Sequence, residues 1–174
     1  HRHLRPPPGP QAARLDLRPM TVTGPVTQPD PTTHDLETRA DIHDLVVAFY
    51  REIVFDDLLE PVFGEVAEVD WALHIPKLID YWCRVLLGQP GYAGAILNAH
   101  RHVHDIEPFR VEHFDRWYAL WIDAIDQRWA GPTADLAKTH AAHIAAVLAR
   151  KLLDLDWQPP APPRTVGTPP PPTL

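Results

Sequence analysis

The sequence has a single cysteine, Cys83, and no apolar run long enough to cross a bilayer. One cysteine excludes an internal disulfide, which suits a reducing compartment. The first residues also lack the apolar segment of a secretory signal peptide. We therefore expect a cytoplasmic protein that has no membrane span and depends on an apolar core for its stability.

Positive charge is also scarce, because 16 lysines and arginines stand against 23 aspartates and glutamates, for a formal net charge of −7. The basic residues form no block along the chain. Proteins that follow a phosphate backbone carry such a block or a clustered basic face. Nucleic acid is therefore not an expected partner.

Proline is scarce in the middle of the chain and abundant at both ends. Residues 1–34 and 158–174 hold eight prolines each, and five of the 21 lie between them. Proline-dense segments lack backbone donors for helices and sheets, so we expect disordered tails at 1–34 and 158–174. Such tails can bind aromatic-lined grooves of a partner domain, although a solvated tail is the simpler interpretation. One folded domain is expected at 35–157.

No part of this domain alternates apolar and polar residues, whereas several parts repeat apolar residues at helical spacing. The spacing predicts longer helices near 39–54, 71–87, 110–129 and 132–153, and a short helix near 94–105. Thr38 with Asp41 resembles a capping box, and Asp70 and Gly88 are expected to bound the second helix. Pro76 lies inside that helix and predicts a kink. The fold class is therefore all-α, with short connectors.

Apolar stripes on these helices contain three polar side chains. Tyr50 and Trp117 lie on the stripes of the first and third long helices, and His74 lies on that of the second. Each alone fits a core residue with a satisfied hydrogen bond. Together, three converging donors indicate a small polar site inside an apolar pocket. The stripe of the last helix is expected at Leu136, His140, Ile144, Val147 and Leu148.

Three histidines stand at two-residue steps in "LNAHRHVHDIEPF", at positions 100, 102 and 104. On a helix only His100 and His104 share a face, and this spacing can hold one zinc ion. The sequence has no second cysteine and no H-E-x-x-H pattern to complete such a site. An exposed histidine run remains an alternative for His102 and His104. The remaining candidates, His113, His140 and His143, are expected to be structural or surface residues.

Five stretches in a fixed order resemble a truncated haemoglobin, most closely of group III. They are "AFYREI", "PVF", "DWALHIPKLIDYWCRVLLG", "YAGAILNAH" and "HFDRWYALW", and the resemblance spans about residues 39–153. The resemblance implies a two-over-two helical sandwich around haem b. It also implies that His100 is the proximal iron ligand, with His104, one turn on, as a rival. The residues "RHVHDIEPF" after that position look longer than the shortest members of the family allow.

On the opposite side of the haem, the resemblance implies that Tyr50, His74 and Trp117 stabilise a bound ligand. Wall contacts to haem are expected from a further set of side chains, namely Phe49, Phe63, Leu78, Tyr81 and Trp82. Lys77 and Arg84 are candidates for the haem carboxylates, and a solvated helix face is an equal alternative for both.

The resemblance implies reversible binding of dioxygen, nitric oxide or carbon monoxide. It also implies turnover such as peroxide reduction or nitric oxide oxidation, supported by a reductase. Two alternatives stay open at this point. The first is a haem-free helical interaction module that works through its proline-rich tails. The second is a non-haem metal protein that uses His100, His104 and a carboxylate.

Overall fold

The computed structural model describes residues 33–161, so the two expected tails lie almost entirely outside the described residues. Five α-helices and one π-helix follow each other: α1 (Arg39–Ile53), η1 (Pro61–Val66), α2 (Trp71–Leu87), α3 (Ile96–Ile106), α4 (Val111–Asp126) and α5 (Pro132–Leu153). The described part of the chain has no β-strand, only an isolated bridge between His34 and Trp129. The prediction of an all-α fold with four longer helices is confirmed.

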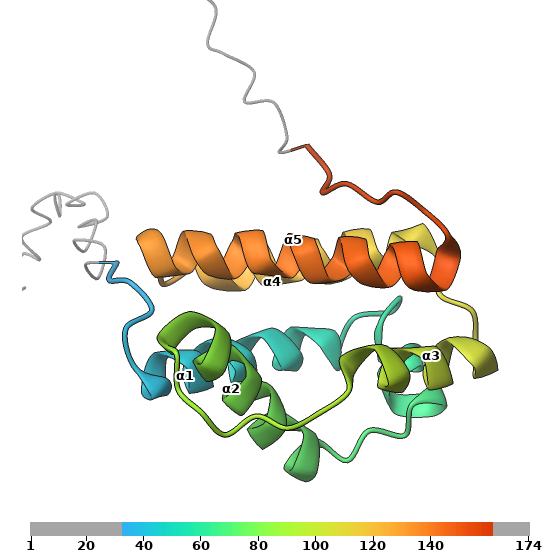
Figure 1. Ribbon diagram of the computed structural model, residues 1–174, viewed down its shortest axis with the longest axis horizontal. Coiled ribbons are helices and arrows are strands. Elements are labelled where there is room, and N and C mark those ends of the chain that lie inside the picture. The colour runs from blue at the N-terminus through green and yellow to red at the C-terminus, as the bar shows by residue number, and fades with distance from the viewer. Residues whose placement is uncertain (1–32, 162–174) are drawn as a thin grey trace, which may run out of the picture. The chain divides into compact units, whose positions relative to one another are not determined.

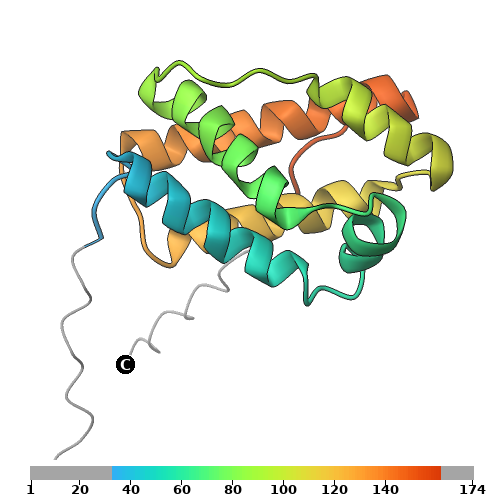
Figure 2. The same cartoon turned by 90° about the horizontal axis from the view of Figure 1, so that it is seen from below.

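The helices of residues 33–161 form two layers. Figure 1 shows α4 and α5 side by side above a layer that contains α1, α2 and α3. Helix α1 packs against α2 within its layer and against α4 across the layers, whereas α3 packs against α5 and η1. The view from below in Figure 2 shows α1 and α2 crossing in front of α4 and α5. This arrangement is the two-over-two sandwich that the family resemblance implies.

Helix α1 begins where local chemistry predicts it. The Thr38 hydroxyl accepts a hydrogen bond from the Asp41 amide, and the Asp41 carboxylate accepts one from the Thr38 amide, so the capping box is present. The helix has an apolar stripe whose residues recur every three or four positions and are buried: Ile42, Leu45, Val46, Phe49, Tyr50 and Ile53. This periodicity holds α1 against both α2 and α4.

Helix α2 also has the predicted ends. The Asp70 carboxylate accepts a hydrogen bond from the Ala72 amide at 3.1 Å, and Gly88 ends the helix in the left-handed region at φ 67°. Pro76 removes one backbone donor, yet the helix continues through it to Leu87. No described helix is long and apolar enough to cross a membrane.

The boundary between α3 and α4 is set by Pro108. Glu107 adopts an extended conformation, which residues before proline prefer, and α3 ends at Ile106. Helix α4 ends at Asp126, three residues earlier than the prediction for 110–129. The backbone after it turns, and the Ala130 amide donates to the His34 carbonyl at 3.1 Å. The incoming N-terminal segment therefore replaces the last turn of the predicted helix.

The predicted stripe of α5 is wrong in part. Leu136 and Val147 are exposed, and the buried face of α5 is made mainly of alanines at positions 134, 137, 141, 145 and 149. Small side chains allow α5 to lie close to α4, where the Trp121 indole N–H donates to the Ala137 carbonyl at 3.2 Å. A hydropathy pattern that favours leucine and valine misses a face whose contacts require the smallest residues.

The N-terminus of α5 is capped from a distance in sequence. The Asp35 carboxylate accepts hydrogen bonds from the Thr133 and Ala134 amides at 2.9 and 2.8 Å, because the helix's own N-cap residue, Gly131, has no side chain. A Cβ at Gly131 would lie 2.5 Å from the Asp35 Cγ, so this position needs glycine. The neighbouring Leu36 is fully buried. The folded part therefore includes the segment before α1.

We expect Asp35→Ala to lower the free energy of unfolding by about 1 kcal/mol, the usual contribution of a capping carboxylate. The three amides that donate to Asp35 lower the pKa of its carboxyl against the opposing effect of burial. The contribution is therefore complete above an unfolded pKa of about 4 and is lost as the pH falls through the lower folded value. Urea unfolding at neutral pH and at low pH measures both effects.

The matched control for this experiment is Glu37→Ala, because Glu37 is an exposed acid two residues further on. It removes the same charge and leaves the cap intact. An equal loss of stability in the two variants, or a loss in Asp35→Ala that does not shrink in acid, would contradict the capping role.

Candidate functional site

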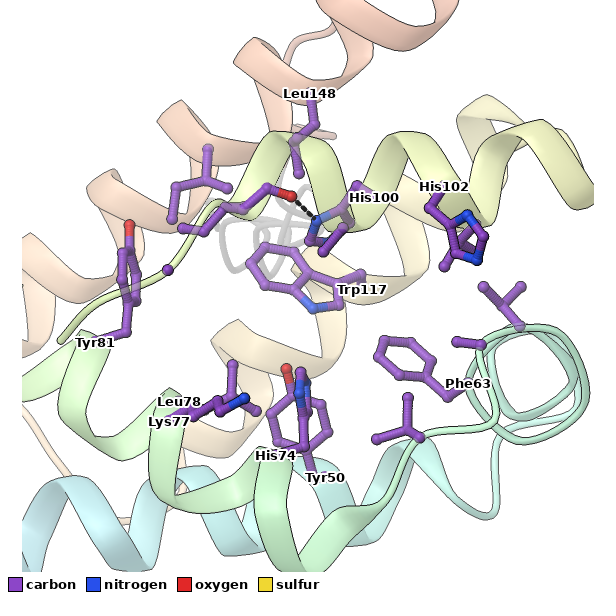
Figure 3. Close-up of a pocket in the computed structure, with 18 of the residues that line it drawn as sticks. Tyr50, Phe63, His74, Lys77, Leu78, Tyr81, His100, His102, Trp117 and Leu148 are labelled. Carbon is purple, nitrogen blue, oxygen red and sulfur yellow. Dashed lines mark hydrogen bonds between the residues drawn. The ribbon is translucent and has the colours of Figure 1, made fainter.

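A cavity of about 610 Å³ lies between the two layers, and every helix of the described chain contributes to its wall. Most of the lining side chains are aliphatic or aromatic, with a few histidines, three tyrosine hydroxyls, two acidic residues and one lysine at particular positions. Figure 3 shows His100 on one side of this cavity, with Tyr50, His74 and Leu78 on the other. A mostly apolar cavity with a few placed polar groups is typical of a site for a large planar ligand or cofactor.

The side chain of His100 comes from α3 and is held in one tautomer. Its Nδ1 lies 2.8 Å from the Ile96 carbonyl oxygen, one turn earlier, as the dashed line in Figure 3 marks. A carbonyl oxygen only accepts, so Nδ1 carries the proton and Nε2 keeps a free lone pair. Burial lowers the pKa of this imidazole, although the hydrogen bond to Ile96 opposes the shift. A neutral imidazole with a fixed ring is the form that binds a metal ion.

The other two histidines of α3 differ from His100 in their surroundings. His104 does not line the cavity, and its Nδ1 accepts a hydrogen bond from the Phe109 amide at 2.9 Å. That bond ties the end of α3 to the connector before α4, which is a structural role. His102 lies at the cavity wall but is exposed to solvent. Of His100 and His104, the two rivals for a ligand, only His100 lines the cavity, where its imidazole is partly buried.

Tyr50 and His74 lie together across the cavity from His100. Their ring centroids are 6.2 Å apart with planes nearly perpendicular, and Tyr50 is 8 % exposed. Burial raises the pKa of the Tyr50 hydroxyl above its usual range, and hydrogen bonding with the Trp117 side chain opposes that shift. The hydroxyl therefore remains a donor at any ordinary pH.

His74 is half-buried, and burial lowers the pKa of its imidazole, with a smaller effect from the charges of His100 and Lys77. Trp117 extends from α4 into the same cavity. The three polar side chains that the sequence places on three different helices thus meet at one wall. Their hydroxyl, imidazole and indole groups can all donate hydrogen bonds to a small ligand.

Four of the five side chains that are expected to contact the cofactor lie at the cavity wall. Phe63, Leu78, Tyr81 and Trp82 line the cavity. Phe63 comes from η1 and stacks on Trp71 at a centroid distance of 5.9 Å.

Phe49 does not line the cavity, so its expected cofactor contact is not supported. The side chain is fully buried and packs edge-on against Tyr50, Trp117 and Trp121. Phe49 therefore supports the cavity wall from behind.

Lys77 and Arg84, the two candidates for binding the haem carboxylates, differ in position. Lys77 lines the cavity, whereas Arg84 does not, and its guanidinium donates to the Tyr92 carbonyl at 3.3 Å. Only Lys77 can therefore meet an acidic group of a ligand at the rim without a rearrangement.

The sequence analysis misses a polar contact at this cavity, between the Tyr81 hydroxyl and His140 Nε2 at 2.6 Å. Fifty-nine residues separate the two, and the pairing depends on how α2 crosses α5. His140, expected to be a structural or surface residue, therefore has a hydrogen-bond partner at the cavity wall. In the sequence, His140 lies between apolar residues of one helix face, and this position does not identify its hydrogen-bond partner.

The described residues contain no group of three or more His, Cys, Asp and Glu side chains that could hold a metal ion. His100 and His104 do not converge with a carboxylate, as a non-haem site would require. A metal ion bound to His100 would therefore need further ligands, and a cofactor would have to supply them.

Comparisons with known proteins agree with this geometry. No family model matches the chain. A curated group 3 truncated haemoglobin of Campylobacter jejuni is 30 % identical over 88 residues, which cover 49 % of this chain and 67 % of that protein. The crystal structure of a group III truncated haemoglobin from Campylobacter jejuni aligns with a TM-score of 0.61 and 25 % identity, over 69 % of this chain and 94 % of that one. The chain therefore belongs to the truncated haemoglobin family, in its group III.

Proposed function

We propose that the protein binds haem b in the cavity through His100, and binds a diatomic gas on the side of Tyr50. One observation carries this proposal: a partly buried, neutral imidazole lies opposite the polar side chains of Tyr50, His74 and Trp117 across a single cavity. Membership of the truncated haemoglobin family implies a haem cofactor and small diatomic ligands. The cavity volume of about 610 Å³ and its aromatic lining fit such a flat, mostly apolar group.

When bound, haem would supply an iron that can bind a small ligand. His100 would hold the group, because its Nε2 lone pair is free and its ring orientation is fixed by Ile96. Phe63, Leu78 and Trp82 would cover the faces of the disc, and burial of its apolar surface supplies much of the binding energy. Lys77 would stand near a carboxylate at the rim.

The hydrogen-bond donors on the Tyr50 side of the cavity would determine how long a small ligand stays bound. The Tyr50 hydroxyl does not ionise at ordinary pH, so it donates a hydrogen bond to any partially negative atom that faces it. His74, half-buried and neutral, offers a second donor or acceptor beside it. Hydrogen bonds to charged acceptors contribute about 1.5–3 kcal/mol each, so two of them would slow ligand release by orders of magnitude.

Slow release is poorly suited to delivering dioxygen along a gradient. It suits chemistry at the cavity better, and we infer peroxide reduction or oxidation of nitric oxide as the reaction class. Both need an electron donor such as a reductase. In either reaction Tyr50 and His74 would orient the small substrate and supply hydrogen bonds to its leaving oxygen.

Absorption spectroscopy of the purified full-length chain tests the proposal. We expect an intense Soret band after addition of hemin, and distinct spectra for the ferric, ferrous and gas-exposed protein. A colourless protein that does not take up hemin would contradict the proposal and favour a haem-free interaction module. Zinc or another metal found by elemental analysis without a Soret band would favour a non-haem metal protein.

A further inference from the structure

Tyr81 and His140 form a hydrogen-bonded pair at the wall of the cavity, on the side away from Tyr50. The Tyr81 hydroxyl and His140 Nε2 are 2.6 Å apart, and both side chains are partly exposed to solvent. Burial raises the pKa of Tyr81 to about 12, and burial lowers the pKa of His140, assisted by the charge of His143. At neutral pH the phenol therefore keeps its proton and faces a neutral, basic imidazole nitrogen.

A row of three tryptophans, Trp82, Trp121 and Trp117, connects this pair to the side of the cavity where Tyr50 lies. Trp82 stacks on Trp121 at a centroid distance of 4.4 Å and an interplanar angle of 22°. Trp121 in turn lies parallel to Trp117, within 1° and at 6.3 Å. Tyr81 contacts Trp82 edge-on at 5.5 Å. Four aromatic rings thus follow one another from the Tyr50 side to a partly exposed phenol.

The middle of this row is shielded from water. Trp121 is fully buried and Trp82 is 3 % exposed, so neither indole can meet a dissolved reductant. Tyr81, at one end of the row, lines the cavity and is also partly exposed to solvent, and Trp117 lines the cavity at the other end. An electron that enters at Tyr81 can therefore reach the cavity from two sides, directly or through the indoles.

We propose that Tyr81 is a redox-active tyrosine that delivers electrons to an oxidant in the cavity. The proposal rests on the proposed function, because the oxidant is the haem group after reaction with a hydroperoxide. Tyr81 loses one electron toward the cavity, its O–H bond breaks, and the proton passes to His140 Nε2. The products are a neutral tyrosyl radical, a protonated imidazole and an oxidant reduced by one electron.

The overall reaction balances over two such steps. Reduction of an organic hydroperoxide to one alcohol and one water consumes two electrons and two protons. Reduction of hydrogen peroxide to two waters consumes the same number of each. Each step draws one electron and one proton from the Tyr81–His140 pair. A dissolved one-electron donor, such as a phenol or ascorbate, then returns a hydrogen atom equivalent to Tyr81 at the surface. Radical chemistry of this kind is driven by the cofactor, and the protein supplies the path.

Tyr81 is distinguished from the other three tyrosines, all of which lie within the described residues. Tyr50 is buried and has no hydrogen-bonded base, and Tyr118 packs on Trp157 away from the cavity. Tyr92 lines the same cavity and lies 5.1 Å from Tyr81, yet its hydroxyl has no imidazole partner in the described structure. Tyr92→Phe is therefore a matched control.

The test uses the full-length chain loaded with haem, with the Soret band measured first. Ferric protein is mixed with hydrogen peroxide, frozen within milliseconds to seconds and examined by electron paramagnetic resonance. We expect a tyrosyl radical, identified because its hyperfine splitting narrows when the tyrosine rings are deuterated. The signal should persist in Tyr92→Phe and be lost in Tyr81→Phe. His140→Gln, which cannot accept the proton, should lose it as well.

Three results would overturn the inference: no tyrosyl signal in the parent protein, a signal unchanged in Tyr81→Phe, or one carried by tryptophan alone. Absence of a Soret band is a different result, because it would contradict the proposed function and not the role of Tyr81. In that case a dissolved ruthenium photosensitiser with persulfate oxidises the haem-free chain. The radical should again be found at Tyr81 and not at Tyr92, and the opposite distribution would overturn the inference.

Discussion

Replacing His100 with alanine is expected to abolish haem retention. The substitution removes the partly buried imidazole whose Nδ1 is fixed by the Ile96 carbonyl and whose Nε2 is free. Of the other histidines on that side of the described cavity, His102 is exposed, and His113 Nδ1 already accepts a hydrogen bond from the Arg110 amide. After gel filtration, the ratio of Soret absorbance to protein absorbance should fall to near background in His100→Ala.

His104→Ala is the matched control, since it removes the same side chain one turn further along α3. His104 lies outside the cavity and accepts a hydrogen bond from the Phe109 amide, so its loss should affect stability and leave haem retention intact. His102→Ala should change little, because that imidazole is exposed. If His100→Ala kept the haem spectrum and His104→Ala lost it, the assigned ligand would be wrong.

Replacing Tyr50 with phenylalanine is expected to increase the dissociation rate of dioxygen from the haem-loaded protein by about 10- to 150-fold. This range corresponds to one lost hydrogen bond to a partially charged acceptor, about 1.5–3 kcal/mol. The phenyl ring keeps the contacts with Phe49 and Phe63, so the wall of the cavity should stay in place. Stopped-flow displacement of dioxygen by carbon monoxide measures the rate.

Tyr118→Phe serves as the control for this experiment. It removes a hydroxyl from a tyrosine that packs on Trp157 and does not line the cavity. Its dissociation rate should equal that of the parent protein. An unchanged rate in Tyr50→Phe would remove Tyr50 from the ligand-binding site.

Features that depend on neighbouring residues are predicted well from the sequence. The ends of α1 and α2 follow from Thr38 with Asp41, from Asp70 and from Gly88, because a cap acts within about one turn. The start of α5 at Pro132 is predicted for the same reason. Helical spacing also places Tyr50, His74 and Trp117 on inward faces, and the structure brings all three to one cavity.

Features that depend on contacts between distant segments are predicted poorly. The end of α4 depends on the pairing of Ala130 with His34, almost a hundred residues earlier. The different roles of His100 and His104 depend on the turn at Pro108, which brings the Phe109 amide to His104. No periodicity in the sequence indicates that His140 meets Tyr81. These contacts arise only when helices pack in a definite order.

The alanine face of α5 determines how this fold can vary. A methyl group has no rotamers to adjust. The separation between α4 and α5 is therefore fixed by side chains of α4 that contact the backbone of α5 directly, as Trp121 does at Ala137. Enlarging Ala137 or Ala141 to valine would displace a whole helix, whereas enlarging a residue in the distal wall would rotate only a side chain. Natural or engineered changes in ligand selectivity should therefore accumulate on α1 and α2, with α5 acting as an invariable frame.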